Sequence, residues 1–172
     1  MNGRFMAAVV GFMLMIGSSP LAVAGSACAT GHARYDLMGA PGFTAGFVAQ
    51  APRRGWLTDA ALFVHSAASG KTFWFLFDQG SARYVNLIST TDVTVPGWAP
   101  PSPDGGERPL RDMHYLAADS GLRFDAVPPR ATAVAPTYIL LPDLSETLWY
   151  GQKDGAKEAA PTAFFKLTAC AP

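Results

Sequence analysis

Short apolar runs separated by turn-forming residues dominate the chain beyond residue 24. The clearest run is Phe73-Trp74-Phe75-Leu76-Phe77, which is followed by the turn residues Asp78-Gln79-Gly80-Ser81. Successive side chains of a strand point to opposite faces, so the three phenylalanines would share one face, and Trp74 and Leu76 the other. A strand with one face in water would alternate apolar with polar residues. We therefore expect both faces of this strand to be covered, the second either by loops and the proline-rich segment or by a ligand pocket that Trp74 lines.

Similar runs of about four to eight residues recur along the chain, with Gly, Pro, Ser or Asp between them. The predicted strands are Ala33–Met38, Ala45–Gln50, Ala60–Ser66, Thr72–Phe77, Arg83–Thr90, Met113–Ala117, Leu122–Asp125, Thr137–Leu141, Thr147–Tyr150 and Thr162–Thr168. Leu144–Glu146 is expected to form one short helical turn. The segment Thr58–Ala68 also has apolar residues on one helical face, but the strand interpretation is preferred because a hairpin turn leads from it straight into Thr72.

Turn signals between the runs fix the expected fold class. The segments 68–71, 78–81 and 119–121 each contain a glycine among polar residues and are typical of hairpins. Many short strands at this spacing predict an all-β domain, either an antiparallel sandwich or a barrel-like sheet. Pro96–Pro109, with five prolines and three glycines, and Gly151–Pro161 are predicted loops. Connections this long are usually binding loops or disordered segments.

The first 24 residues have the pattern of a secretory signal peptide. Arg4 precedes an apolar run from Phe5 to Ile16, and Ala22-Val23-Ala24 is a small-residue cleavage site. The run is shorter than the roughly 20 residues that span a bilayer. We expect a signal peptide at residues 1–24, a single β-domain at residues 25–172 and a periplasmic or secreted location.

Two cysteines, Cys28 and Cys170, bracket almost all of the mature chain. In an oxidising compartment such a pair predicts one disulfide that joins the two ends. The alternative is acylation of Cys28, because Gly25-Ser26-Ala27-Cys28 resembles part of a lipoprotein signal, although Gly25 stands where those signals usually carry an aliphatic residue.

The composition excludes some classes of partner. Basic and acidic residues balance at 13 each, and Arg53-Arg54 is the largest basic cluster, so the sequence lacks the footprint of a nucleic-acid binder. The mature region has no second apolar run long enough for a transmembrane helix. Aromatic residues make up 12% of the chain and charged residues only 15%, which is the balance of a folded domain.

The chain contains none of the serine-hydrolase, phosphate-loop or zinc-binding motifs that would identify a cofactor, a metal or a catalytic group. Asp112 and His114 are two residues apart, so on a strand they would share a face and could orient a base or bind a metal. A small exported hydrolase or metalloenzyme that uses His114, His65 and Asp112 is therefore one hypothesis.

The favoured hypothesis is a non-enzymatic binding module for a small apolar ligand or an envelope protein. The candidate ligand contacts are Trp74 on the aromatic strand, Trp98 in the proline-rich loop and Asn86 in the polar string that follows an apolar strand. Trp98 could instead fold down over the sheet as a lid. A structural subunit of an envelope assembly is the third alternative.

Overall fold

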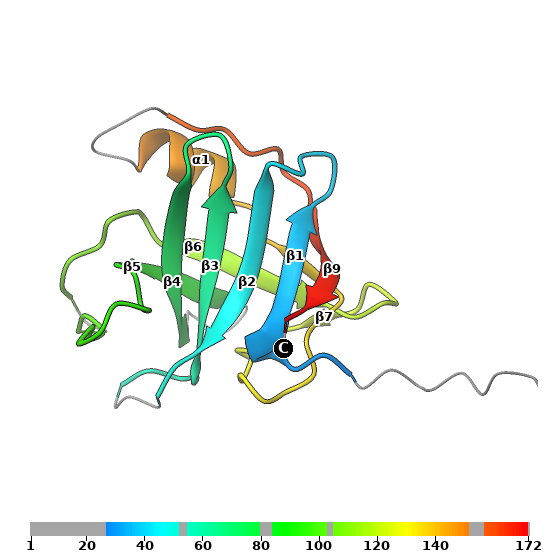
Figure 1. Ribbon diagram of the computed structural model, residues 1–172, viewed down its shortest axis with the longest axis horizontal. Helices are drawn as coiled ribbons and strands as arrows, with labels where there is room; N and C mark the ends of the chain where they lie inside the picture. Colours follow the sequence, from blue (N-terminus) through cyan, green and yellow to red (C-terminus); the bar gives the residue numbers. More distant parts are fainter. Residues whose placement is uncertain (1–26, 52–54, 80–83, 103–104, 152–156, 172) are drawn as a thin grey trace, which may run out of the picture.

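The computed structural model describes residues 27–51, 55–79, 84–102, 105–151 and 157–171. Their backbone is almost entirely β-structure, with one short α-helix (Figure 1). In chain order the elements are η1 (Thr30–His32), β1 (Ala33–Leu37), β2 (Phe43–Ala49), β3 (Ala60–Ser66), β4 (Lys71–Gln79), β5 (Val85–Thr90), β6 (Met113–Ala118), β7 (Phe124–Asp125), β8 (Tyr138–Leu140), α1 (Leu144–Tyr150) and β9 (Phe164–Cys170).

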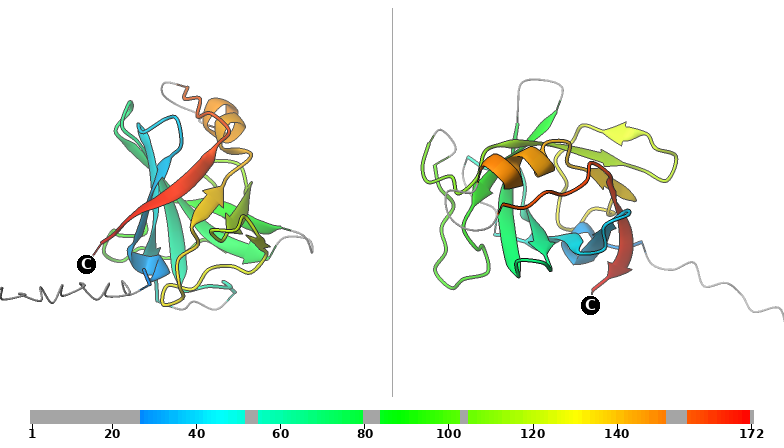
Figure 2. Two further views of the ribbon diagram at one scale, coloured as in Figure 1. Left: turned by 90° about the vertical axis from the view of Figure 1, so that its right-hand side faces the viewer. Right: turned by 90° about the horizontal axis from the view of Figure 1, so that it is seen from above.

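The strands form a closed antiparallel barrel, as the two perpendicular views show (Figure 2). Eight strands follow one another around it in the order β5-β4-β3-β2-β1-β9-β8-β6, and pairing of β5 with β6 closes the ring. Strand β6 pairs with β8 along one edge, and β5 and β7 share its other edge. Of the two all-β architectures that the sequence predicts, the structure is therefore the barrel.

Aromatic and aliphatic side chains fill the barrel interior. The Phe77 ring stacks on Phe47 with centroids 6.1 Å apart, and Tyr115 meets the Phe77 ring edge-to-face at 5.0 Å. Phe75 and Phe77 are buried in this core, as the alternation along β4 predicts. An eight-stranded barrel is just wide enough for side chains to fill, and here the rings of Phe47, Phe77 and Tyr115 pack against one another in the interior.

The outer face of β4 is covered by the connection between β5 and β6. Leu76 packs with Ala61 and Val93, and Trp74 and Trp98 lie against the same cluster. The prediction that both faces of this strand are covered is confirmed. At Leu76 the proline-rich segment provides this cover, because its Trp98 packs against the cluster that contains Leu76.

One predicted strand is wrong, because Thr147–Tyr150 is the second half of helix α1. The buried residues Leu144, Thr147 and Leu148 follow the i, i+3, i+4 spacing of a helix face, and the two leucines join the barrel core. The helix lies across one end of the barrel, at the top of Figure 1. The barrel end therefore buries the apolar face of this helix.

The two ends of the described chain lie side by side. Cys170 is the register partner of Ala33, and the Cα atoms of Cys28 and Cys170 are 5.7 Å apart, which places the two sulfurs at disulfide distance. This confirms the predicted pairing and fits an oxidising compartment. The expected signal peptide and residues 80–81 of the predicted turn at 78–81 lie outside the described residues. None of the described helices has the length and apolar character needed to cross a membrane.

Candidate functional site

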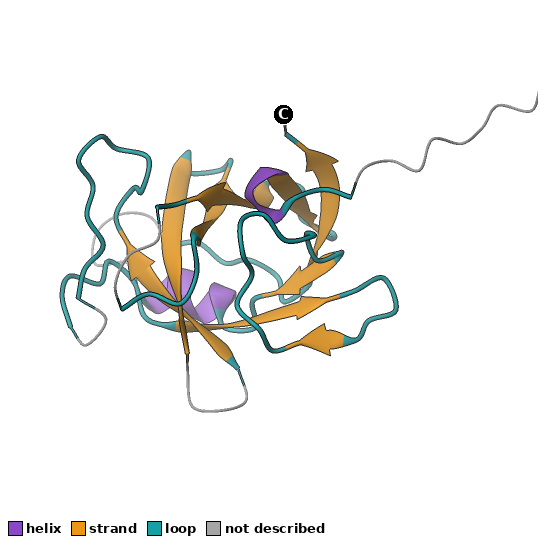
Figure 3. Ribbon diagram, turned by 90° about the horizontal axis from the view of Figure 1, so that it is seen from below, coloured by secondary structure: helices purple, strands orange, loops and turns teal. Residues whose placement is uncertain are grey.

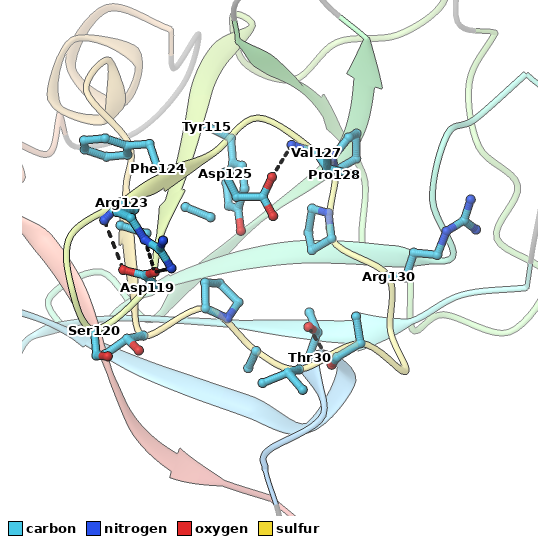
Figure 4. A pocket seen from close by; sticks show the side chains of 18 residues that line it. Thr30, Tyr115, Asp119, Ser120, Arg123, Phe124, Asp125, Val127, Pro128 and Arg130 are labelled. Carbon is cyan, nitrogen blue, oxygen red and sulfur yellow. Dashed lines mark hydrogen bonds and ion pairs between the residues drawn. The ribbon is translucent and has the colours of Figure 1, made fainter.

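A cavity of about 800 Å³ lies at the barrel end opposite α1, where Figure 3 looks onto the molecule from below. Its wall comes from β6 and the β6–β7 hairpin, from the segment 127–137 that follows β7, and from Thr30 of η1 (Figure 4). These parts are far apart in the sequence and meet only because the barrel is closed. We call this hollow the Tyr115 cavity, after the buried tyrosine in its wall.

The segment 127–137 is held firmly on the barrel. The carbonyl of Ala133 accepts hydrogen bonds from the Thr30 amide at 2.8 Å and the Thr30 hydroxyl at 3.1 Å. The Ala135 amide donates to the carbonyl of Cys28 at 2.8 Å, and on the other side the Ala131 amide donates to the Asp59 carboxylate at 2.9 Å. A loop fixed at several points gives the cavity a preformed wall, which lowers the entropic cost of binding.

Two buried tyrosines beside this wall differ in their hydrogen bonding. The Tyr35 hydroxyl donates to the carbonyl of Pro136 at 2.9 Å. The Tyr115 hydroxyl is also buried but has no hydrogen-bond partner among the described residues. Burial raises the pKa of both phenols, and at Tyr115 the neighbouring Tyr35 and Asp125 raise it further. Tyr115 therefore stays neutral and keeps its proton as a donor.

The β6–β7 hairpin forms one side of the cavity mouth. Asp119 Oδ1 accepts hydrogen bonds from the amides of Gly121 at 2.8 Å and Arg123 at 3.0 Å, and Asp119 Oδ2 accepts one from the Arg123 guanidinium at 2.9 Å. The backbone and side-chain hydrogen bonds of Arg123 lower the pKa of the Asp119 carboxyl. Leu122, within this turn, has a φ of 61°, the left-handed region that non-glycine residues seldom adopt.

Apolar side chains gather around the mouth. Phe124, Val127 and Val134 line the cavity and are 55%, 65% and 70% exposed. Asp119, Asp125, Arg123 and Arg130 also line it, so acidic and basic groups balance there. A mouth with exposed apolar groups and no excess charge favours an uncharged, partly apolar molecule.

A second hollow, of about 530 Å³, lies against the wall formed by β4 and β5. Its lining includes Trp74 and the polar string from Ser89 to Asp92. Of the predicted ligand contacts, Trp74 therefore lines a hollow and Trp98 packs beside it in the outer cluster. Asn86 lies elsewhere, on β5 between Asp78 and His114, so the structure does not bring the three residues together.

His65 and His114, which the hydrolase hypothesis combines, do not meet in one place either. His65 Nδ1 is 3.0 Å from the hydroxyl of Thr72. His114 Nδ1 is 2.8 Å from Asp143 Oδ2, so its carboxylate partner is Asp143 and not Asp112. His65 pairs with Thr72 of β4, whereas His114 pairs with Asn86, which is opposite Asp78 of β4. Thr72 and Asp78 are six residues apart, so the positions of the two histidines are separated by roughly 20 Å along β4, at 3.3 Å per residue.

No group of three potential metal-ligating side chains occurs within the part of the chain that the structure describes. The Tyr115 cavity itself was missed by sequence reasoning. Only its hairpin, at 119–121, gave a sequence signal, and that signal indicated a turn. Comparisons with protein-family models, with curated proteins and with solved structures found no match.

Proposed function

We propose that this protein is an exported, non-enzymatic binding module that holds a small, uncharged and partly apolar ligand in the Tyr115 cavity. The observation that carries the proposal is the buried hydroxyl of Tyr115, which has no partner among the described residues and lies in the wall of a hollow of about 800 Å³. A buried hydroxyl without a partner costs about 1–3 kcal/mol. A ligand with a hydrogen-bond acceptor would remove that cost on binding.

The volume and shape of the cavity support a small molecule. Small-molecule sites typically have volumes of about 300–1,000 Å³, with mostly apolar walls and a few polar groups that orient the ligand. Here the apolar contribution comes from Phe124, Val127 and Val134, and the polar one from Tyr115 and Asp125. Asp125 Oδ1 accepts the amide of Val127 at 3.0 Å, which fixes the carboxylate at the mouth.

The charge of Asp125 disfavours an anion beside the Tyr115 hydroxyl. An anion near Tyr115 would face Asp125, whose charge already raises the phenol's pKa. Arg123 cannot offset this freely, because its guanidinium is bound to Asp119. A ligand with a carbonyl or ether oxygen toward Tyr115 and an apolar body toward the mouth satisfies both constraints.

Export to the periplasm or to the outside of the cell completes the proposal. It is supported by the signal-peptide pattern at residues 1–24 and by the pairing of Cys28 with Cys170.

The experiment is a fluorescence titration of residues 25–172 with 6-propionyl-2-dimethylaminonaphthalene, a neutral aromatic ketone whose emission depends on its surroundings. We expect saturable binding with a blue-shifted emission. Tyr115→Phe removes the donor and keeps the ring, so it should weaken binding about tenfold, the value of one hydrogen bond of about 1.4 kcal/mol.

Tyr138→Phe is the matched control, because Tyr138 lies on β8 against Phe164 and does not line the cavity. It should leave the affinity unchanged. Equal affinities of the wild type and Tyr115→Phe, or no saturable binding at all, would contradict the proposal.

A further inference from the structure

The second hollow lies at the base of the longest connection in the barrel. β5 ends at Thr90 and β6 begins at Met113, and the two ends of the intervening connection come together beside the start of β4. We call this hollow the outer groove, defined by its lining of Thr72, Phe73, Trp74, Ser89–Asp92, Pro109 and Leu110. Long connections in compact domains are commonly functional.

Buried hydrogen bonds clamp the two ends of the connection together. The Ser89 hydroxyl donates to the carbonyl of Leu110 at 2.7 Å and accepts the amide of the same residue at 2.9 Å. This clasp fixes the distance between the β5 wall and the Pro109–Leu110 wall of the outer groove. The groove is therefore built into the fold.

The aromatic wall is fixed as well. Trp74 lies 5.5 Å from the ring of Phe63, between ring centroids, and packs with Leu76 and Val93 in the outer cluster. It is only partly buried and also lines the outer groove. An indole held from one side is a ready surface for the apolar face of a ligand, because the face of the ring attracts the weakly positive C–H groups of that ligand.

The polar wall consists of short side chains around one carboxylate. Thr72, Thr90 and Thr91 carry hydroxyls, which can both donate and accept hydrogen bonds, and the Thr72 hydroxyl also contacts His65 Nδ1 at 3.0 Å. Asp92 Oδ1 accepts the Thr94 amide at 2.8 Å and the Thr94 hydroxyl at 2.7 Å, and neither bond uses Oδ2. The turn that follows Asp92 thus orients the carboxylate through Oδ1, and Oδ2 takes no part in these two bonds.

A strand edge adds backbone groups to the groove. The β3–β4 ladder extends to Lys71, whereas the β4–β5 ladder begins only at Trp74, opposite Thr90. Thr72 and Phe73 therefore have no ladder partner on β5, and they line the groove at this edge. Successive residues of a strand direct their backbone N–H and C=O groups to opposite edges, so one of these two residues presents its backbone groups to the groove.

Among the residues that the structure describes, no lysine, arginine or histidine lines the outer groove, and Asp92 is its single titratable residue. This lining does not suit a phosphate or another anion. One aromatic face, several hydroxyls and one carboxylate match a molecule that has an apolar C–H face and an edge of hydroxyl groups. We propose that the outer groove is a second binding site, for the sugar ring of a neutral saccharide that stacks on Trp74 and bonds to Asp92, Thr91 and Thr72.

The test is an NMR titration of residues 25–172 with cellohexaose, maltohexaose and N-acetylchitohexaose as probes. At least one probe should give saturable shifts of the Trp74 indole N–H. Thr91→Val and Asp92→Asn keep the side-chain shapes, and an amide oxygen at position 92 can still accept the Thr94 amide. Each should weaken binding about tenfold, the loss of one hydrogen bond.

Thr162→Val, an exposed threonine ahead of β9, is the matched control and should bind like the wild type. The proposal is overturned if no probe shifts the Trp74 resonance, or if the affinity survives both groove substitutions. The ketone titration tests the Tyr115 cavity, which is a different site. Failure of the saccharide titration would therefore contradict only the outer-groove proposal and not the proposed function.

Discussion

At the scale of single residues, the contrast between Tyr35 and Tyr115 carries the functional argument. Both side chains are buried in the same barrel, and burial raises the pKa of both phenols. Among the described residues, only Tyr35 has a protein acceptor, the carbonyl of Pro136. The unpartnered hydroxyl at Tyr115 is a local cost to the fold, and such costs concentrate at sites that bind something else.

This contrast predicts opposite effects of the same substitution on stability. Tyr35→Phe breaks a buried hydrogen bond and should lower the free energy of unfolding by about 1 kcal/mol or more. Tyr115→Phe removes a group that has no partner, so the free energy of unfolding should stay unchanged or rise. Urea denaturation of the ligand-free variants measures both values. A loss at Tyr115→Phe as large as that at Tyr35→Phe would mean that its hydroxyl is already satisfied.

At the scale of elements, the β6–β7 hairpin depends on one carboxylate. Asp119 holds two amides of the turn and the guanidinium of Arg123. The hydrogen bonds lower its pKa from the ordinary value of 3.8. The stabilisation is therefore present above pH 3.8 and is lost as the pH falls through the lower, folded-state pKa.

We expect the amide resonances of Gly121 and Arg123 to titrate together as the pH is lowered from neutral, with a midpoint below 3.8. Protonation of Asp119 weakens the bonds that these amides donate. NMR spectra recorded across the titration measure the midpoint. In Asp119→Asn the shared transition should disappear, and a midpoint at or above the ordinary value in the wild type would contradict this account of the turn.

Helix α1 shows where reading single elements failed. Thr147 to Tyr150 are residue types common in strands, and taken alone they predicted one. The spacing of Leu144, Thr147 and Leu148 is helical, but it becomes visible only when the predicted short turn at 144–146 is joined to the segment after it. The two segments form one element because the open barrel end needs an apolar cover.

At the scale of the whole molecule, the pairing of Cys28 with Cys170 links the barrel closure to the cavity. The two residues are 142 positions apart, and Cys28 also accepts the amide of Ala135 in the cavity wall. Ala29 next to it forms a β-bridge with Val134 at the mouth. Loss of the disulfide would free the chain segment on which this wall rests.

Replacement of both cysteines by serine should therefore affect stability and binding together. The chain-entropy model gives a loss of about 4–5 kcal/mol for a loop of this length, with smaller values common in practice. Affinity for the ketone probe should fall as well, because segment 127–137 loses a fixed support. Calorimetric unfolding and probe titration measure the two effects. An unchanged unfolding midpoint would show that the pair does not stabilise the fold.

The sequence predicted most of the barrel but not the candidate site. The alternation along β4 placed Phe75 and Phe77 on one face of a strand covered on both sides, and the cysteine positions predicted that the ends meet. The Tyr115 cavity could not be predicted, since its lining from Thr30 to Thr137 comes together only when β6 pairs with both β5 and β8. Whether a tyrosine hydroxyl finds a partner is likewise decided by three-dimensional packing, as Tyr35 and Tyr115 show.

The most direct test of the central claim is the position of the bound ketone probe, measured by nuclear Overhauser effects between the protein and 6-propionyl-2-dimethylaminonaphthalene. We predict contacts from the propionyl group to the ring of Tyr115 and from the naphthalene to Phe124 and Val134. Contacts confined to Trp74, to helix α1 or to any other surface would contradict the assignment of the Tyr115 cavity as the binding site.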